Sequence, residues 1–286
     1  MIDSMKTIKN QTLDKERALY AAKDTIVENC RFDGPADGES ALKEGRNIIV
    51  NKSFFNLRYP FWHDKKLEIN NCELTSLCRA ALWYSKDIKI NKSKLLGIKA
   101  LRECQNIVIK DSRVDSPEFG WRNKNVTIIN TNLINTDYFM FETKDIKLDK
   151  VKMQGKYSFQ YTKNVVIEDS VLDTKDAFWH AKNVTVKNST IKGQYLAWYS
   201  DGLTLINWKI IGTQPLCYCK NLKLINCTME KTDLSFEYSD VEATIKGSID
   251  SVKNPKSGFI KADKIKKIIL EDSIMKSKCE IKEKCH

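Results

Sequence analysis

The sequence predicts an all-β protein, a single-stranded right-handed parallel β-helix of about a dozen coils. Three observations predict it: a short pattern that repeats about every 19 residues, an in-and-out alternation of apolar residues within each copy, and a turn-forming residue at a fixed place before that alternation. Short strands that recur at a constant period with turns between them are typical of β-helices. Stacked coils bury a continuous core that no single coil buries alone.

The repeat appears when the copies are aligned on one small residue, called here the anchor. The anchors are Ser53, Cys72, Ser93, Ser112, Thr131, Val151, Ser170, Ser189, Trp208 and Cys227, with weaker copies at Cys30 and Ser273. Most successive anchors are 19 residues apart, as from Ser93 to Ser112. A left-handed helix of hexapeptides is the structural alternative, but the apolar columns are spaced 6, 7 and 6 residues and do not keep its strict step.

Each copy contains a short strand. Apolar residues stand five and three residues before the anchor and two after it, as Ile107, Ile109 and Val114 do around Ser112. A period of two with β-branched residues is the pattern of a half-buried strand. A further apolar column lies eleven residues before the anchor and is expected in the core. Six before the anchor, Asn, Asp or Gly predominates, and these residues tolerate a left-handed turn.

We expect one domain, residues 1–286, because 42% hydrophobic and 30% charged residues are typical of a globular chain. Within it we expect an N-terminal cap and first coil (1–29), an inserted loop and coil (33–46), and irregular last coils with a C-terminal tail (248–286). No apolar run is long enough to span a membrane, so no membrane partner is predicted. The N-terminus has no signal-like apolar segment, so we expect a cytoplasmic protein. The sequence sets no oligomeric state.

The nine cysteines are expected to be reduced thiols that fill small buried positions. Three occupy the anchor and two stand eight residues before it, where other coils carry Ser, Thr or Ala: Cys30, Cys72, Cys227, Cys104 and Cys219. No second cysteine pair completes a zinc site with the nearby Cys217 and Cys219. We therefore predict no metal and no cofactor. The tail CEIKEKCH is the alternative place for a metal.

Aromatic and charged side chains recur ten and nine residues before the anchor, at positions called here the inner and the outer column. The inner column reads Tyr20, Lys43, Trp62, Trp83, Arg102, Trp121, Phe141, Gln160, Trp179, Trp198, Cys217 and Glu237. The outer column reads Ala21, Glu44, His63, Tyr84, Glu103, Arg122, Glu142, Tyr161, His180, Tyr199, Tyr218 and Tyr238. Burying the charged members together would be costly, so we expect both columns on an outward corner.

An exposed aromatic strip predicts a binding surface, here for an oligosaccharide or polysaccharide. Aromatic faces can take sugar rings, and charged or polar groups can bond hydroxyls. The predicted substrate-binding residues are Trp62, His63, Trp83, Tyr84, Arg102, Trp121, Tyr161, Trp179, Trp198, Tyr199 and Tyr218. The alternative is an aromatic ladder that only stabilises coil stacking in a non-catalytic or scaffold module.

If the protein is an enzyme, the predicted catalytic residues are Glu103, Arg122, Glu142 and His180. Two glutamates two coils apart would be separated by about 9.6 Å, near the upper limit of about 9.5 Å for inverting glycosidases. Hydrolysis is the preferred chemistry. The alternatives are a charge-alternating ladder without catalysis and a polysaccharide lyase, which would need Arg122 as its base.

Basic residues dominate a column seven residues before the anchor, called here the lysine row. It reads Lys23, Arg46, Lys65, Lys86, Gln105, Lys124, Lys144, Lys163, Lys182, Asp201 and Lys220. With a net charge of +11, this row favours an anionic polymer. Nucleic acid is the less favoured partner, with aromatics stacking on bases and lysines on phosphates. Lysines at exposed turns also protect sheet edges without binding anything.

The inserted loop RFDGPADGESAL carries Asp33, Asp37 and Glu39 among turn-forming residues. Three carboxylates in seven residues predict either a site at the end of the inner and outer columns that binds a cation or contacts substrate, or an ordinary solvated loop.

Four segments carry a resemblance to a known family: RALYAAKDTIVENCRFDGPADGESALKE, NLRYPFWHD, CRAALWYS and KALREC. On these the chain resembles an uncharacterised bacterial β-helix family, a domain of unknown function. It is also similar to the pectin- and pectate-lyase-like superfamily of right-handed parallel β-helices. The resemblance covers nearly the whole chain and implies the fold, but that family brings no established activity.

Overall fold

The computed structural model describes residues 5–34 and 39–284, and all regular structure in these ranges is β-strand. The predicted all-β parallel β-helix is confirmed, with about 14 turns and a repeat of about 19 residues. The chain divides into two compact units, unit 1 (Met1–Asp145) and unit 2 (Ile146–His286).

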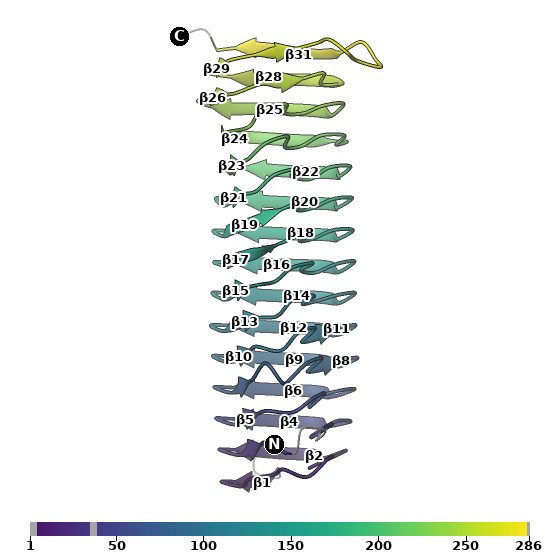
Figure 1. Ribbon diagram of the computed structural model, residues 1–286, viewed down its shortest axis with the longest axis vertical. Coiled ribbons are helices and arrows are strands. Elements are labelled where there is room, and N and C mark those ends of the chain that lie inside the picture. Colours follow the sequence, from purple (N-terminus) through teal and green to yellow (C-terminus); the bar gives the residue numbers. More distant parts are fainter. Residues whose placement is uncertain (1–4, 35–38, 285–286) are drawn as a thin grey trace. The chain divides into compact units, whose positions relative to one another are not determined.

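Unit 1 alternates long strands before the anchor with short strands after it. Each long strand pairs in parallel with the long strand of the next coil, so that Ile107 lies beside Val126. Figure 1 shows these strands one above another in the purple-to-teal part of the chain. The strands are β1 (Lys6–Lys9), β2 (Lys23–Glu28), β3 (Arg31–Phe32), β4 (Arg46–Asn51), β5 (Phe54–Phe55), β6 (Lys65–Asn70), β7 (Glu73–Leu74), β8 (Leu82–Trp83), β9 (Lys86–Asn91), β10 (Lys94–Leu95), β11 (Leu101–Arg102), β12 (Gln105–Lys110), β13 (Arg113–Asp115), β14 (Lys124–Ile129) and β15 (Asn132–Ile134), and β16 (Lys144–Asp149) crosses the unit boundary.

Unit 2 continues the same alternation, and the length of its last coils becomes irregular. Its strands are β17 (Lys152–Lys156), β18 (Lys163–Glu168), β19 (Val171–Lys175), β20 (Lys182–Lys187), β21 (Thr190–Lys192), β22 (Asp201–Ile206), β23 (Lys209–Ile211), β24 (Leu222–Glu230), β25 (Asp240–Lys246), β26 (Ser248–Ile249), β27 (Val252–Lys253), β28 (Ser257–Ala262), β29 (Lys264–Ile265), β30 (Ile268–Ile269) and β31 (Lys278–Glu283). The weak copy anchored at Ser273 is wrong, because Ser273 is exposed outside any strand and β31 is the strand that pairs with β28.

The core consists of the apolar columns that the alternation predicts. Ile107, Ile109 and Val114 are each no more than 1% exposed. The column eleven residues before the anchor is buried as well, except for the half-buried Leu19 at its beginning. Phenylalanines of this column stack between coils, as Phe159 and Phe178 do with ring centroids 4.6 Å apart. Burial of the column confirms which side of each coil faces inward.

The anchor is small because its side chain bridges two coils. The Ser93 hydroxyl donates to the Asn91 carbonyl at 2.8 Å and accepts the Cys72 N–H at 3.0 Å. A thiol fits the same place, since the Cys72 sulfur accepts the Ser53 N–H at 3.4 Å. Cys30, Cys72 and Cys227 are free and buried, as predicted. Burial raises the pKa of Cys72 to about 11.

The turn six residues before the anchor is left-handed, as its Asn, Asp and Gly content predicts. Asn106 and Asn125 have φ of 57° and 59°. The side chains form an amide ladder, in which Asn125 Nδ2 donates to Asn106 Oδ1 at 3.0 Å. This turn fixes where each long strand begins. It therefore also fixes the position of the residues seven to ten places before the anchor, which precede the turn.

Candidate functional site

The outer column lies at a second left-handed turn, which the sequence pattern did not predict. His63 and Tyr84 have φ of 59° and 60°, which costs energy for residues with a side chain. Each of their N–H groups donates to the inner-column carbonyl of the next coil, His63 to Trp83 at 2.9 Å and Tyr84 to Arg102 at 3.1 Å. Repeated on successive coils, these hydrogen bonds hold the inner-column and outer-column positions of neighbouring coils in register.

The inner column of unit 1 is a continuous stack. The rings of Trp62 and Trp83 are parallel within 5° at 5.1 Å. The guanidinium of Arg102 lies between the next pair, 4.7 Å from the ring of Trp83 and 4.6 Å from that of Trp121. All four side chains are half-buried. The predicted file of tryptophans is confirmed within unit 1.

Unit 2 holds the other two predicted tryptophans in the same arrangement. Trp179 and Trp198 stack at 5.5 Å with an angle of 3° between their rings. Their indole N–H groups donate to backbone carbonyls, Trp179 to Tyr195 at 2.7 Å and Trp198 to Gln214 at 2.8 Å. The indole donors are therefore engaged within the protein.

Stacking leaves little of the tryptophan faces for a ligand. Trp83 lies between Trp62 and Arg102, and Trp121 lies between Arg102 and Phe141. The prediction that these faces receive sugar rings does not fit this packing. The physical reason is that the coil spacing of about 4.8 Å is close to the distance at which aromatic groups stack. The inner column behaves as the predicted alternative, a ladder that joins coils.

The outer column of unit 2 is a second and more exposed file. Successive ring centroids are 4.9 Å apart from Tyr161 to His180, 5.2 Å from His180 to Tyr199 and 4.7 Å from Tyr199 to Tyr218. Tyr161 is 52% exposed and Tyr199 is 48% exposed. Since neighbouring rings cover each other's faces, we infer that the exposed surface comes mainly from the ring edges, which carry the hydroxyl groups and imidazole nitrogens.

The hydroxyl of Tyr218 is a neutral donor over a wide pH range. Burial, together with the nearby Glu237 carboxylate, raises the pKa of Tyr218 to about 12. In unit 1 the file is shorter, with His63 and Tyr84 stacked at 5.0 Å. The outer column thus offers hydrogen-bonding groups in both units.

Three of the four predicted catalytic residues lie together in unit 1. Arg122 Nε donates to Glu142 Oε2 at 2.8 Å, and all three side chains of Glu103, Arg122 and Glu142 are exposed. The hydrogen bond that Arg122 donates to Glu142 chiefly, and then the charges of Glu142 and Glu103, raise the pKa of Arg122. Arg122 is therefore held as a cation, which disfavours the base that a lyase would need. His180 belongs to the aromatic file of unit 2.

A third column flanks the tryptophans and was not selected from the sequence. It lies thirteen residues before the anchor, where Tyr59 contacts Trp62 at 4.7 Å and Tyr195 contacts Trp198 at 5.5 Å between centroids. Glu118 of this column accepts from Arg102 at 3.3 Å and so holds the guanidinium between its tryptophans. Counting tyrosines at this position, as at the other two, would have found the column.

The acidic loop uses its described carboxylates internally. Asp33 pairs with Arg31 and accepts from Asn56 Nδ2 at 2.7 Å, and Glu39 lies 3.8 Å from Arg58. Asp37 is outside the described residues. Within 5–34 and 39–284, no three potential ligands form a metal-binding group.

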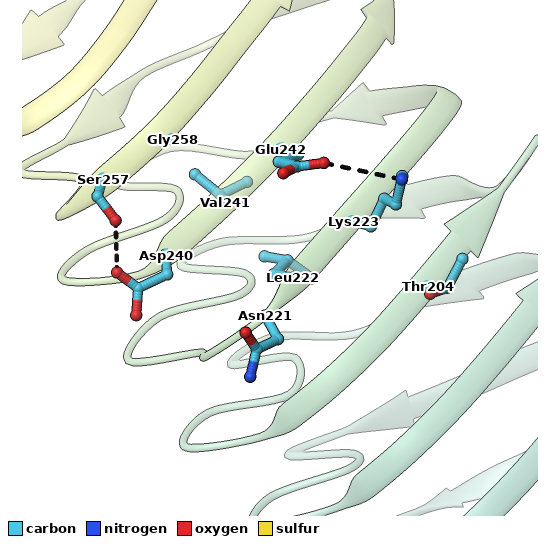
Figure 2. A pocket seen from close by; sticks show the side chains of 9 residues that line it. All are labelled: Thr204, Asn221, Leu222, Lys223, Asp240, Val241, Glu242, Ser257 and Gly258. Carbon is cyan, nitrogen blue, oxygen red and sulfur yellow. Dashed lines mark hydrogen bonds and ion pairs between the residues drawn. The ribbon is translucent and has the colours of Figure 1, made fainter.

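A shallow hollow of about 310 Å³ lies over the strands β22, β24, β25 and β28 of unit 2 (Figure 2). Its charged side chains are engaged: Asp240 accepts from Ser257 Oγ at 2.6 Å, and Lys223 lies 3.7 Å from Glu242. The charged groups that line the hollow therefore pair with one another.

Comparison with known families finds one family model that matches most of the chain. The sequence matches the family described as "Protein of unknown function (DUF3737)" over residues 6–282. The chain belongs to this family. The DUF3737 assignment agrees with the resemblance to a β-helix domain of unknown function. A search of curated proteins found no match.

Solved structures similar to this DUF3737 protein are remote. The surface adhesin PfbA of Streptococcus pneumoniae has a TM-score of 0.47 at 10% identity, covering 93% of this chain and 84% of its own. The mannuronan C-5 epimerase AlgE6 A-module of Azotobacter vinelandii has a TM-score of 0.37 at 11% identity, covering 98% and 90%. The periplasmic alginate epimerase AlgG has 0.29 at 10%, covering 97% and 72%. These likenesses carry no argument about what this chain binds.

In the part of the chain that the structure describes, no helix is long and apolar enough to cross a membrane.

Proposed function

We propose that this protein binds an oligosaccharide or polysaccharide along its outer column. The observation that carries the proposal is the stacked file of Tyr161, His180, Tyr199 and Tyr218, in which the first three side chains are exposed and the fourth is half-buried. Because the rings cover each other's faces, we infer that their polar edges are what a ligand meets. Phenol hydroxyls donate and accept hydrogen bonds, and the two imidazole nitrogens together do both. Sugar hydroxyls have the same dual character, so the two surfaces are complementary.

The spacing of the file suits a linear polymer. Polar rims recur at the ring separations of 4.9, 5.2 and 4.7 Å along the direction in which the coils stack. A hydroxyl-bearing chain that runs in this direction meets one rim on each coil, and its contacts add up with length. We therefore expect affinity to rise with the number of sugars until the file within a unit is filled.

The same geometry favours carbohydrate over nucleic acid. Single strands are usually held by bases that stack on aromatic faces, worth about 1–3 kcal/mol for each base. In the outer column, His180 lies between Tyr161 and Tyr199, so both of its faces are covered. Hydrogen bonds to hydroxyls need only the ring edges, which remain exposed.

We assign Glu103, Arg122 and Glu142, which belong to the outer column of unit 1, to a charge ladder and not to hydrolysis. The Glu142 carboxylate is bonded to Arg122, and the group stands in open solvent. Glycosidases stabilise developing charge with preorganised groups in water-excluded sites. The proposed activity is binding without bond cleavage.

The test is a tyrosine-to-phenylalanine pair that keeps the ring stack and removes only hydroxyls. The double variant Tyr161→Phe, Tyr199→Phe should bind a carbohydrate ligand about 10- to 30-fold more weakly, since each lost hydrogen bond is worth about 1 kcal/mol. Affinity is measured by isothermal titration with the best oligosaccharide from a glycan array.

The matched control is Tyr20→Phe, the same chemical change at an exposed tyrosine outside the outer column. It should bind like the parent. Equal affinity of the double variant and the parent would contradict the proposal.

A further inference from the structure

The lysine row of unit 1 places like charges side by side on successive coils. Lys23 pairs with Arg46, Arg46 with Lys65 and Lys65 with Lys86 across β2, β4, β6 and β9. Neighbouring coils are about 4.8 Å apart, and like charges directly opposite each other destabilise a sheet. The fold does not require a cation at this position, because Gln105 follows Lys86 in the same register.

Only one of these cations is neutralised by its surroundings. The Arg46 guanidinium donates to the carbonyls of Gly45 and His63 at 2.8 Å each and approaches the Glu44 carboxylate at 3.4 Å. Lys65 and Lys86 are exposed, and neither forms an ion pair with a described acidic residue.

The acidic residues next to the row are engaged with amides. Asp24 accepts from Asn47 Nδ2 at 2.6 Å, and Asp87 accepts from Asn106 Nδ2 at 2.8 Å. These carboxylates belong to the ladder six residues before the anchor and reduce the repulsion without pairing with the lysines. The row therefore keeps an unpaired positive charge.

The row stands between the outer column and a hollow. His63 and Tyr84 of the outer column precede Lys65 and Lys86 by two residues. On the other side, a hollow of about 360 Å³ is lined by Asn47, Ile49, Lys66, Glu68, Asp87 and Lys89. A polymer that contacts the outer column thus passes within reach of the unpaired lysines.

We propose that the carbohydrate bound here is anionic, a glycan whose charged groups lie against Lys65 and Lys86 while its hydroxyls contact His63 and Tyr84. This inference rests on the proposed function and names its ligand class. An anion between the two ammonium groups relieves their repulsion, which a neutral glycan cannot do. The gain is larger because the protein carries a net charge of +11, which attracts polyanions from a distance.

The experiment compares charged and neutral forms of the same backbone: carboxymethylcellulose with hydroxyethylcellulose, and dextran sulfate with dextran. Affinity electrophoresis of the parent should show at least tenfold tighter binding to the charged member of one pair. The preference should shrink as salt rises, because exposed charges are screened. Equal binding of both members in both pairs would overturn the inference.

Variants locate the preference on the row. The double variant Lys65→Gln, Lys86→Gln should lose most of the preference for the charged polymer. The double variant Lys65→Arg, Lys86→Arg should keep this preference. The control Lys94→Gln, Lys110→Gln removes the same charge from exposed positions outside the row and should retain the preference. An unchanged preference in the glutamine pair, or an equal loss in the control, refutes the assignment.

Three further outcomes are decisive. Lysine-row-dependent binding of single-stranded oligothymidylate as tight as that of the charged glycan would overturn the inference in favour of nucleic acid. Neutral glycan binding that depends on Tyr161 and Tyr199 without a charge preference refutes this inference alone. Absence of binding to any glycan refutes the proposed function with it.

Discussion

Replacing Asp64 by asparagine tests the physics of the coil interior. Asp64 stands eight residues before its anchor and is 1% exposed. Its Oδ1 accepts the Gly45 N–H at 2.8 Å, while Oδ2 is buried without a hydrogen-bond partner. Burial raises the pKa of Asp64 well above its usual value, and the Gly45 hydrogen bond and the Arg46 charge oppose this only in part. The carboxyl group is therefore better accommodated protonated.

The sign of the pH dependence follows from the raised pKa. The folded protein holds this proton more tightly than the unfolded chain does, so the stabilising effect is fully present below the unfolded pKa of about 3.9. It is lost as pH rises from that value towards the folded pKa. Within this window the free energy of unfolding should fall by about 1.4 kcal/mol per pH unit for this one group.

Asparagine removes the titration and keeps the shape. Asn123 already occupies the same position in another coil, where its Oδ1 accepts the Cys104 N–H at 2.7 Å and its Nδ2 is buried without a partner. Asp64→Asn should therefore fold normally and become more stable relative to the parent as pH rises. The advantage should grow by about 1.4 kcal/mol per pH unit from about pH 4 up to the folded pKa of Asp64.

The assay is urea unfolding of both proteins by tryptophan fluorescence between pH 4 and pH 7. The control is Asp173→Asn, a change at an exposed aspartate that pairs with Lys192. It should show no such growing advantage. Parallel pH profiles for the parent and Asp64→Asn would refute the reasoning.

Three other predictions concern the core, the inner column and the charge ladder. Cys30, Cys72 and Cys227 should react with a thiol reagent only on the timescale of unfolding, because they are buried; rapid labelling of all three in the native protein contradicts this. Arg102→Gln should lower the free energy of unfolding by about 1–3 kcal/mol in urea titrations, since its half-buried guanidinium contacts two indoles. The exposed control Arg113→Gln should change it by about 0.5 kcal/mol or less, and equal effects would show that the stack is not stabilising. Glu103→Gln and Glu142→Gln should leave glycan binding intact in titrations, and any hydrolysis that these variants abolish would restore the catalytic hypothesis.

The columns of the fold were predictable because each follows from one local preference. Alternation placed Ile107 and Ile109 in the core, and the left-handed tolerance of asparagine placed Asn106 at its turn. The turn at Tyr84 was not predictable, since no intrinsic preference of tyrosine favours a φ of 60°. Backbone bonds to the next coil impose it.

The candidate site was predicted in position but not in orientation. The recurrence of Trp83 and Trp121 in the inner column located the candidate site. Which parts of the rings face solvent depends on contacts between coils. The guanidinium of Arg102 covers the indoles of Trp83 and Trp121, each of which is 19 residues away in the sequence. Asp64 was missed because a single carboxylate in a column of small polar residues carries no periodic signal.

The most direct test of the central claim is a glycan array probed with the purified protein. Binding along the outer column predicts retention of a set of related oligosaccharides, with signals that increase with chain length over several sugars. The same array probed with Tyr161→Phe, Tyr199→Phe should show weaker signals for that set. No binding to any carbohydrate, or signals that ignore both chain length and the two hydroxyls, would contradict the account.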